Sequence, residues 1–179
     1  MIRRGYADMR EHIDALDNAG LLRRIDAPIN KDTELHPLVR WQFRGGIRES
    51  ERKAFLFENV IDGIGRRYDM PVVVGALAAS AQIYAIGMGV DLDQIGETWR
   101  RAISAPIPPV EISSGRCQEI VISGDELTRR GLECLPVPIS TPGYDSAPYL
   151  TATNCITRDP DSGIANMGTY RCGLKSPTR

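Results

Sequence analysis

The chain has few of the residues that build a simple metal or disulfide site. Its 179 residues include two histidines and four cysteines, Cys117, Cys134, Cys155 and Cys172, with no C-x-x-C pair. This pattern is not typical of a zinc ribbon and does not indicate a disulfide framework. We therefore expect reduced, mostly buried thiols, a cytoplasmic location and no Cys/His metal cluster.

Excess charge and long apolar runs are also scarce. The 22 basic and 23 acidic residues leave a net charge of −1, which provides no overall field to attract nucleic acid or an anionic membrane. No segment approaches the ~18–20 apolar residues that cross a bilayer. Charged residues between Arg3 and Arg10 interrupt the region where a signal peptide would be apolar. We expect no nucleic-acid partner and no membrane span.

The first hundred residues predict alternating helices and strands. Tyr6, Met9, Ile13 and Leu16 are spaced as one face of a helix, which Gly20 would end. A second helix is expected over 34–43, and residues 79–103 are helical in character, divided near residues 87–89, with Trp99 in a buried packing role. Short strands are expected over 21–27, 54–57 and 71–75. This order indicates a small α/β or α+β unit.

Residues 105–116 are the best linker candidate, because Pro106, Pro108, Pro109 and Gly115 interrupt regular structure there. Beyond them we expect a strand over 117–123, one helical turn over 125–130 and an extended segment over 135–138. The residues after the linker candidate are thus expected to be mainly strand-like runs punctuated by proline.

A β-hairpin is the clearest local prediction. Leu150–Arg158 is rich in Thr and β-branched residues, and Ile164–Arg171 would return as the second strand. In the turn between them, Pro160 presets φ, Asp161 is expected to bond locally, and Gly163 takes a left-handed conformation.

Two polar residues of the second strand are candidate ligands. Asn166 offers an amide oxygen to a metal, and Arg171 offers a guanidinium to an anion. Alternation places Asn166, Gly168 and Tyr170 on one face and Arg171 on the other, with Asn166 and Arg171 roughly 16 Å apart. If both serve one site, the strand must bend or bulge, and Gly168 would permit this. Because strand Asn residues usually only hydrogen-bond and terminal Arg residues are usually solvated, the hairpin alone indicates just an anion or cofactor site.

A series of segments along the whole chain resembles the UbiD-like decarboxylases, also called the polyprenyl-hydroxybenzoate decarboxylase family. The matching segments, in order, are Gly20–Asp26, Ala54–Val60, Met70–Gly75, Leu135–Pro138, Pro148–Ala152, Thr157–Gly163 and Asn166–Arg171.

This resemblance implies an activity, cofactors and residue roles. Such enzymes use prenylated FMN and a divalent metal, usually Mn2+, to remove or add a carboxylate on an aromatic or α,β-unsaturated acid. K+ is a further candidate ion, and a flavin prenyltransferase supplies the cofactor. By resemblance, Asn166 is a metal ligand, while Thr169, Tyr170 and Arg171 bind the cofactor. Arg171 is also the catalytic residue that joins an acidic network around the substrate carboxylate.

The resemblance also implies that the site needs more than this chain. By resemblance, the fold class is α+β: residues 1–110 form the N-terminal α/β domain, and residues 111–179 match only the first strands of a split β-barrel flavin-binding domain. The family's other metal ligands and acidic proton donor lie downstream of the arginine. We therefore expect the chain alone to be inactive and to work as a homo-oligomer or with a partner chain that completes the barrel. A non-catalytic assembly or binding subunit of a split complex is the alternative, and an ordinary FMN-binding split-barrel protein is a third.

Overall fold

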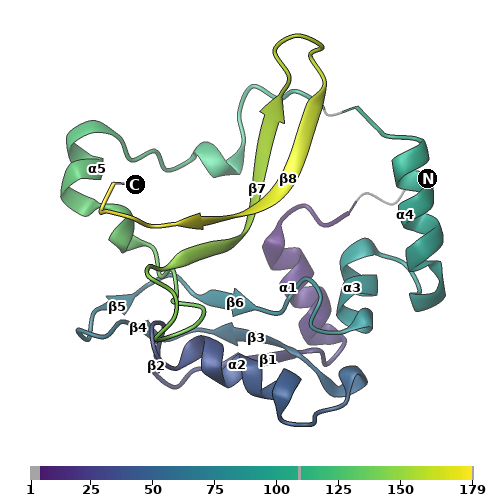
Figure 1. Ribbon diagram of the computed structural model, residues 1–179. Helices are drawn as coiled ribbons and strands as arrows, with labels where there is room; N and C mark the ends of the chain where they lie inside the picture. The colour runs from purple at the N-terminus through teal and green to yellow at the C-terminus, as the bar shows by residue number, and fades with distance from the viewer. Residues whose placement is uncertain (1–4, 109, 179) are drawn as a thin grey trace. The chain divides into compact units, whose positions relative to one another are not determined.

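The computed structural model describes residues 5–108 and 110–178 (Figure 1). Arg3 and Arg4 of the charged N-terminus and Pro109 of the expected linker lie outside these ranges. The chain forms two compact units that interleave along the sequence. The first takes residues up to 26, 39–58 and 72–122, and the second takes 27–38, 59–71 and 123 onward. The predicted boundary near residue 110 stays a prediction.

The first unit is a three-stranded sheet with helices. Its strands are β1 (Leu22–Ile25), β3 (Ala54–Phe57) and β6 (Val72–Val74), in the order β1-β3-β6. β1 runs parallel to β3, with Leu22 opposite Ala54, and β6 runs antiparallel to β3. The helices of this unit are α1 (Met9–Asn18), α3 (Ala81–Met88) and α4 (Ile95–Ser104), with the 3-10 turns η1 (Glu49–Glu51), η2 (Leu92–Gln94) and η3 (Arg116–Gln118).

The core of the first unit lies between this sheet, α1 and α3. Leu16 and Ile83 are fully buried and pack with Leu22, Leu56 and neighbouring alanines. The Asp8 carboxylate caps α1 by accepting hydrogen bonds from the backbone N–H groups of residues 10 and 11. The helix ends where Gly20 adopts a φ of 68°, as predicted.

The second unit contains a small sheet and a long hairpin. The sheet is β2 (Ile29–Asn30), β4 (Val60–Ile61) and β5 (Arg67–Tyr68), in the order β2-β4-β5. The hairpin is β7 (Tyr149–Arg158) and β8 (Ala165–Gly173). The unit also holds α5 (Gly124–Arg130) and the 3-10 turn η4 (Leu132–Cys134), while α2 (Leu35–Arg44) is divided between the two units. In the described residues, no helix has the length and apolar character needed to cross a bilayer.

The predicted α+β fold is confirmed, and three local predictions are wrong. Residues 117–123 form η3 and irregular chain instead of a strand, because Gln118 bonds back to Gly115 through its backbone and side chain. Trp99 is 48% exposed, because its indole N–H donates to the Tyr84 hydroxyl at 2.6 Å near the surface. The cysteines are free as expected, but Cys117 is exposed and the other three are only half-buried.

Candidate functional site

The β7–β8 hairpin carries all the residues predicted for the site. From Arg158 opposite Ala165 to Thr153 opposite Tyr170, the two strands pair antiparallel without interruption. Between this stretch and the next pair, Leu150 opposite Cys172, two residues of β7 face the single residue Arg171 of β8. The ladder therefore contains a β-bulge at Thr151 and Ala152, and Figure 1 shows the hairpin as a curved ribbon.

The bulge lies on β7, whereas the sequence analysis predicted a bend in β8 at Gly168. Gly168 was expected to permit a bend, yet it pairs in register with Cys155. The absence of a side chain at Gly168 has a different use, because the ring of Tyr170 lies over it, in the space that a Cβ would fill. The one extra residue on β7 bends the ribbon without any glycine on β8.

The turn of the hairpin uses a different carboxylate from the predicted one. Asp159, not Asp161, bonds locally: it accepts from the backbone N–H of Asp161 at 3.0 Å and from the Ser162 hydroxyl at 2.5 Å. These two hydrogen bonds, the Ser162 bond first, lower the pKa of Asp159. Asp159 takes this role because a carboxylate at the start of a turn can reach the N–H two residues on. Gly163 has a φ of 71°, as predicted.

Side-chain contacts agree with the predicted alternation of faces. The Thr169 hydroxyl donates to the amide oxygen of Asn154 at 3.4 Å on one face, and Tyr170 lies over Gly168 on the other. Asn166 shares the Tyr170 face by strand register, and Arg171 lies on the Thr169 face. The structure therefore does not bring Asn166 and Arg171 together on one face of the hairpin.

Arg171 is held by an aromatic ring. Its guanidinium carbon lies 5.3 Å from the centroid of Tyr149, and the Lys175 ammonium lies 5.8 Å from the same centroid. Tyr149 can lie across the strand because its partner Gly173 has no side chain: a Cβ there would be 2.8 Å from the ring. Among the described residues, no carboxylate lies within ion-pair distance of Arg171. An exposed guanidinium so placed can bind a carboxylate through two parallel hydrogen bonds.

The described residues offer one candidate metal ligand on the hairpin, Asn166. Asn166 is exposed and offers one amide oxygen, which suits a hard cation such as Mn2+ or Mg2+. In residues 5–108 and 110–178, no group of three or more His, Cys, Asp or Glu side chains is placed to hold a metal. Asn166 fits a divalent ion as a single contributor.

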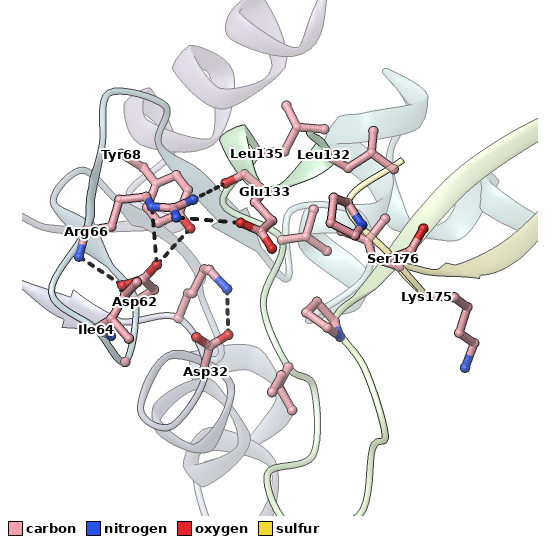
Figure 2. A pocket seen from close by; sticks show the side chains of 17 residues that line it. Asp32, Asp62, Ile64, Arg66, Tyr68, Leu132, Glu133, Leu135, Lys175 and Ser176 are labelled. Carbon is pink, nitrogen blue, oxygen red and sulfur yellow. Dashed lines mark hydrogen bonds and ion pairs between the residues drawn. The ribbon is translucent and has the colours of Figure 1, made fainter. Parts of the chain in front are cut away.

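A cavity of about 440 Å³ lies within the second unit (Figure 2). Arg66 crosses its wall, donating to the Glu133 carbonyl at 3.2 Å and approaching the Glu133 and Asp62 carboxylates at 3.6 and 3.8 Å. Burial raises the pKa of Asp62, but hydrogen bonds from the backbone N–H groups of Arg66 and Ile64 and from the Tyr68 hydroxyl outweigh it, so the net pKa is lowered. The pKa of Tyr68 is raised by burial and then by the Asp62 charge.

Two family models match the chain and together cover most of it. The N-terminal domain of 3-octaprenyl-4-hydroxybenzoate carboxy-lyase (UbiD) matches residues 13–103, more than half of the chain. The Rift-related domain of the same carboxy-lyase matches residues 109–179. The chain belongs to the UbiD family. The resemblance found in the sequence is thereby confirmed.

Solved structures of UbiD-class enzymes have the same fold. HmfF from Pelotomaculum thermopropionicum, in complex with FMN, is 29% identical with a TM-score of 0.75 over 94% of this chain. An evolved dimeric form of HmfF in complex with prFMN is 27% identical with a TM-score of 0.79 over 96%. The vanillic acid decarboxylase of Sedimentibacter hydroxybenzoicus in open form is 27% identical with a TM-score of 0.78 over 97%. This UbiD-family chain spans 35–37% of the length of these proteins.

Sequence reasoning about this UbiD-family chain missed three residues. Tyr149 belongs to a segment noted for resemblance, but its contact with Arg171 was not foreseen. The sequence did contain a signal for this contact. The hairpin register pairs Tyr149 with Gly173, which leaves room for the Tyr149 ring near the cationic Arg171. Lys31 and Tyr68 line the cavity, and neither stands in a pattern that indicates a site.

Proposed function

We propose that the chain is the N-terminal portion of a prenylated-FMN- and metal-dependent reversible decarboxylase. The substrate would be an aromatic or α,β-unsaturated carboxylic acid, and the enzyme would work in the cytoplasm. The observation that carries this proposal is the Arg171 guanidinium of a UbiD-family chain, which lies over Tyr149 and has no acidic partner among the described residues. A cation that already has a carboxylate partner would be a poor receptor for a second one, and Arg171 has none among the described residues.

Arg171 would bind and orient the substrate carboxylate. Its planar fork matches the two oxygens of a carboxylate and stays charged throughout the reaction. Thr169 and Tyr170 precede it on the same exposed strand, so their side chains and the backbone between them would contact the cofactor. The prenylated flavin, when bound, supplies the electron-sink chemistry for breaking the carbon–carbon bond.

Asn166 would give its amide oxygen to the divalent metal at the phosphate end of the cofactor. The remaining ligands would be phosphate oxygens and residues outside this chain, because the described residues hold no acidic or histidine cluster. Asn166 and Arg171 would then serve opposite ends of an extended cofactor, each from a different face of β8. A K+ ion is part of the proposal without an assigned residue.

Further protein would cover the hairpin. Ile156 is 77% exposed and Met167 is 68% exposed, and these side chains are paired on one face of the ribbon. Such exposed apolar residues on a two-stranded ribbon favour contact with further strands, from a longer chain, a second copy or a partner chain. The same observation supports the second candidate, a non-catalytic assembly or binding subunit of a split UbiD-like complex.

Native mass spectrometry tests the proposal. The protein would be expressed anaerobically with a flavin prenyltransferase and analysed with whatever chains co-purify. We expect a complex that contains Mn2+ and a flavin of prenylated mass, and that releases CO2 from an aromatic acid. A complex loaded with unmodified FMN would instead indicate an ordinary flavoprotein. A stable assembly without flavin or activity would favour the assembly subunit.

A further inference from the structure

The cavity of the second unit is lined by both apolar and charged side chains. Its apolar residues include Leu132, Leu135, Val137, Ile139 and Leu174. Its charged and polar residues include Lys31, Asp32 and the group of Asp62, Arg66 and Tyr68 labelled in Figure 2. A volume of about 440 Å³ is typical of a small-molecule site.

Lys31 is the unusual residue of this cavity. Only 8% of its side chain is exposed, although lysine is almost never fully buried without a partner. Its ammonium donates to Asp32 at 2.6 Å and lies 5.9 Å from the centroid of the Tyr68 ring. Within the described part of the chain, Asp32 is its one hydrogen-bond acceptor, so two of its three N–H donors remain for a molecule in the cavity.

The acidic residues of the lining are already engaged. Asp32 faces the Lys31 ammonium, Asp62 accepts three hydrogen bonds, and Glu133 pairs with Arg66. One basic residue of the lining has no acidic partner. Lys175 is exposed, and no carboxylate of the described residues is within ion-pair distance of it. The lining carries three acidic and three basic side chains, and the buried hydrogen-bond donors that remain free for an anion are those of Lys31.

We propose that this cavity binds a small organic acid, an apolar body that carries one carboxylate, with Lys31 as the anchor of the carboxylate. The apolar wall would cover the body, and the free donors of Lys31 would meet the carboxylate oxygens. Lys175 favours an anion by its charge without touching it, since its ammonium lies over Tyr149. The site is separate from the hairpin residues Asn166 and Arg171, neither of which lines the cavity.

Three probes of the purified chain test this site, with no flavin or metal needed. Benzoate has both features, benzamide keeps the ring without the charge, and acetate keeps the carboxylate without the ring. By two-dimensional NMR titration we expect benzoate to shift amides around Lys31, Tyr68 and Leu174, with an affinity about tenfold or more above both comparators. Equal binding of benzamide, or shifts confined to the neighbourhood of Arg171, would overturn the proposal.

Substitutions then separate an anchoring role from a structural one. Lys31→Met keeps the buried stem and should weaken benzoate about tenfold or more, whereas Lys53→Met, in the other unit, should leave it unchanged. Leu174→Trp fills the cavity without altering its charges and should abolish binding. Asp32→Asn should tighten benzoate several-fold, because the ligand then becomes the only counter-ion of Lys31. Weaker binding in Asp32→Asn, or unchanged binding in Leu174→Trp, would contradict the assignment.

Discussion

The guanidinium of Arg171 lies 5.3 Å from the centroid of Tyr149, whose ring crosses the strand at Gly173. The contact joins the start of β7 to the end of β8, beside the bulge at Thr151 and Ala152. A cation over an aromatic face is stabilised electrostatically, and here it limits the freedom of a side chain with no acidic partner among the described residues. Arg171 is therefore oriented before any ligand binds.

Removing the ring should loosen Arg171 without removing its charge. In the flavin-loaded enzyme we expect Tyr149→Leu to raise KM for the acid about two- to fivefold, because an exposed cation–π contact is worth about 0.5–1 kcal/mol. Tyr149→Phe should keep KM near the wild-type value, since the described residues make no hydrogen bond with the Tyr149 hydroxyl. Initial rates of CO2 release would measure both, and equal KM values for the two variants would remove Tyr149 from this role.

Replacing the guanidinium itself should stop the reaction. We expect Arg171→Ala to abolish decarboxylation while much of the flavin stays bound, because the substrate carboxylate loses its bidentate partner. Arg171→Lys, which keeps the charge and loses the fork, should retain only a small part of the rate. Flavin absorbance and CO2 release would be followed on the same preparations, and near-normal turnover in Arg171→Ala would refute the assigned role.

The Asn166 amide is expected to hold the metal and, through it, the cofactor. In Asn166→Ala, metal content and flavin occupancy should fall together, as measured by elemental analysis and absorbance. The matched control is Asn154→Ala, on the paired strand and the opposite face, where the amide accepts from Thr169. Unchanged metal content in Asn166→Ala, or equal loss in both variants, would argue against Asn166 as a ligand.

Acid should weaken the second unit through Asp62. Its folded-state pKa is lowered, so the unfolded chain binds more protons in the acidic range and stability rises with pH there. The contribution is complete above the ordinary Asp pKa of about 3.9 and is lost as the pH falls through the folded-state value. We expect urea unfolding of Asp62→Asn to depend less on pH below about pH 4 than that of the wild type. Equal pH dependence in Asp62→Asn and the wild type would contradict this assignment.

Gly131 should be intolerant of any side chain. Its φ of 64° and ψ of 174° are accessible mainly to glycine, and an added Cβ would lie 3.0 Å from the backbone oxygen of Pro177. We expect Gly131→Ala to lower the free energy of unfolding by about 1–3 kcal/mol. Gly63→Ala, where an added Cβ meets no atom within 4 Å, is the control for urea unfolding. Similar losses in both variants would contradict this explanation.

Local patterns in the sequence predicted most of the elements. The helix of α1, the division between α3 and α4, and both strands of the hairpin follow from apolar spacing and turn residues. The strand predicted over residues 117–123 was wrong because a run of β-branched residues forms a strand only where another strand pairs with it. The predicted burial of Trp99 was wrong because helical spacing shows which residues share a face, but not whether anything covers that face.

The sequence by itself determined the family, the hairpin and the faces on which Asn166 and Arg171 lie, because motifs, turns and strand alternation depend on neighbouring residues. Only the tertiary structure decided the position of the bulge, the cation–π contact between Arg171 and Tyr149, and the burial of Lys31. Tyr149 and Arg171 lie on different strands, and the cavity around Lys31 draws its wall from segments a hundred residues apart. Such contacts follow from how distant segments pack, which no local pattern of residues records.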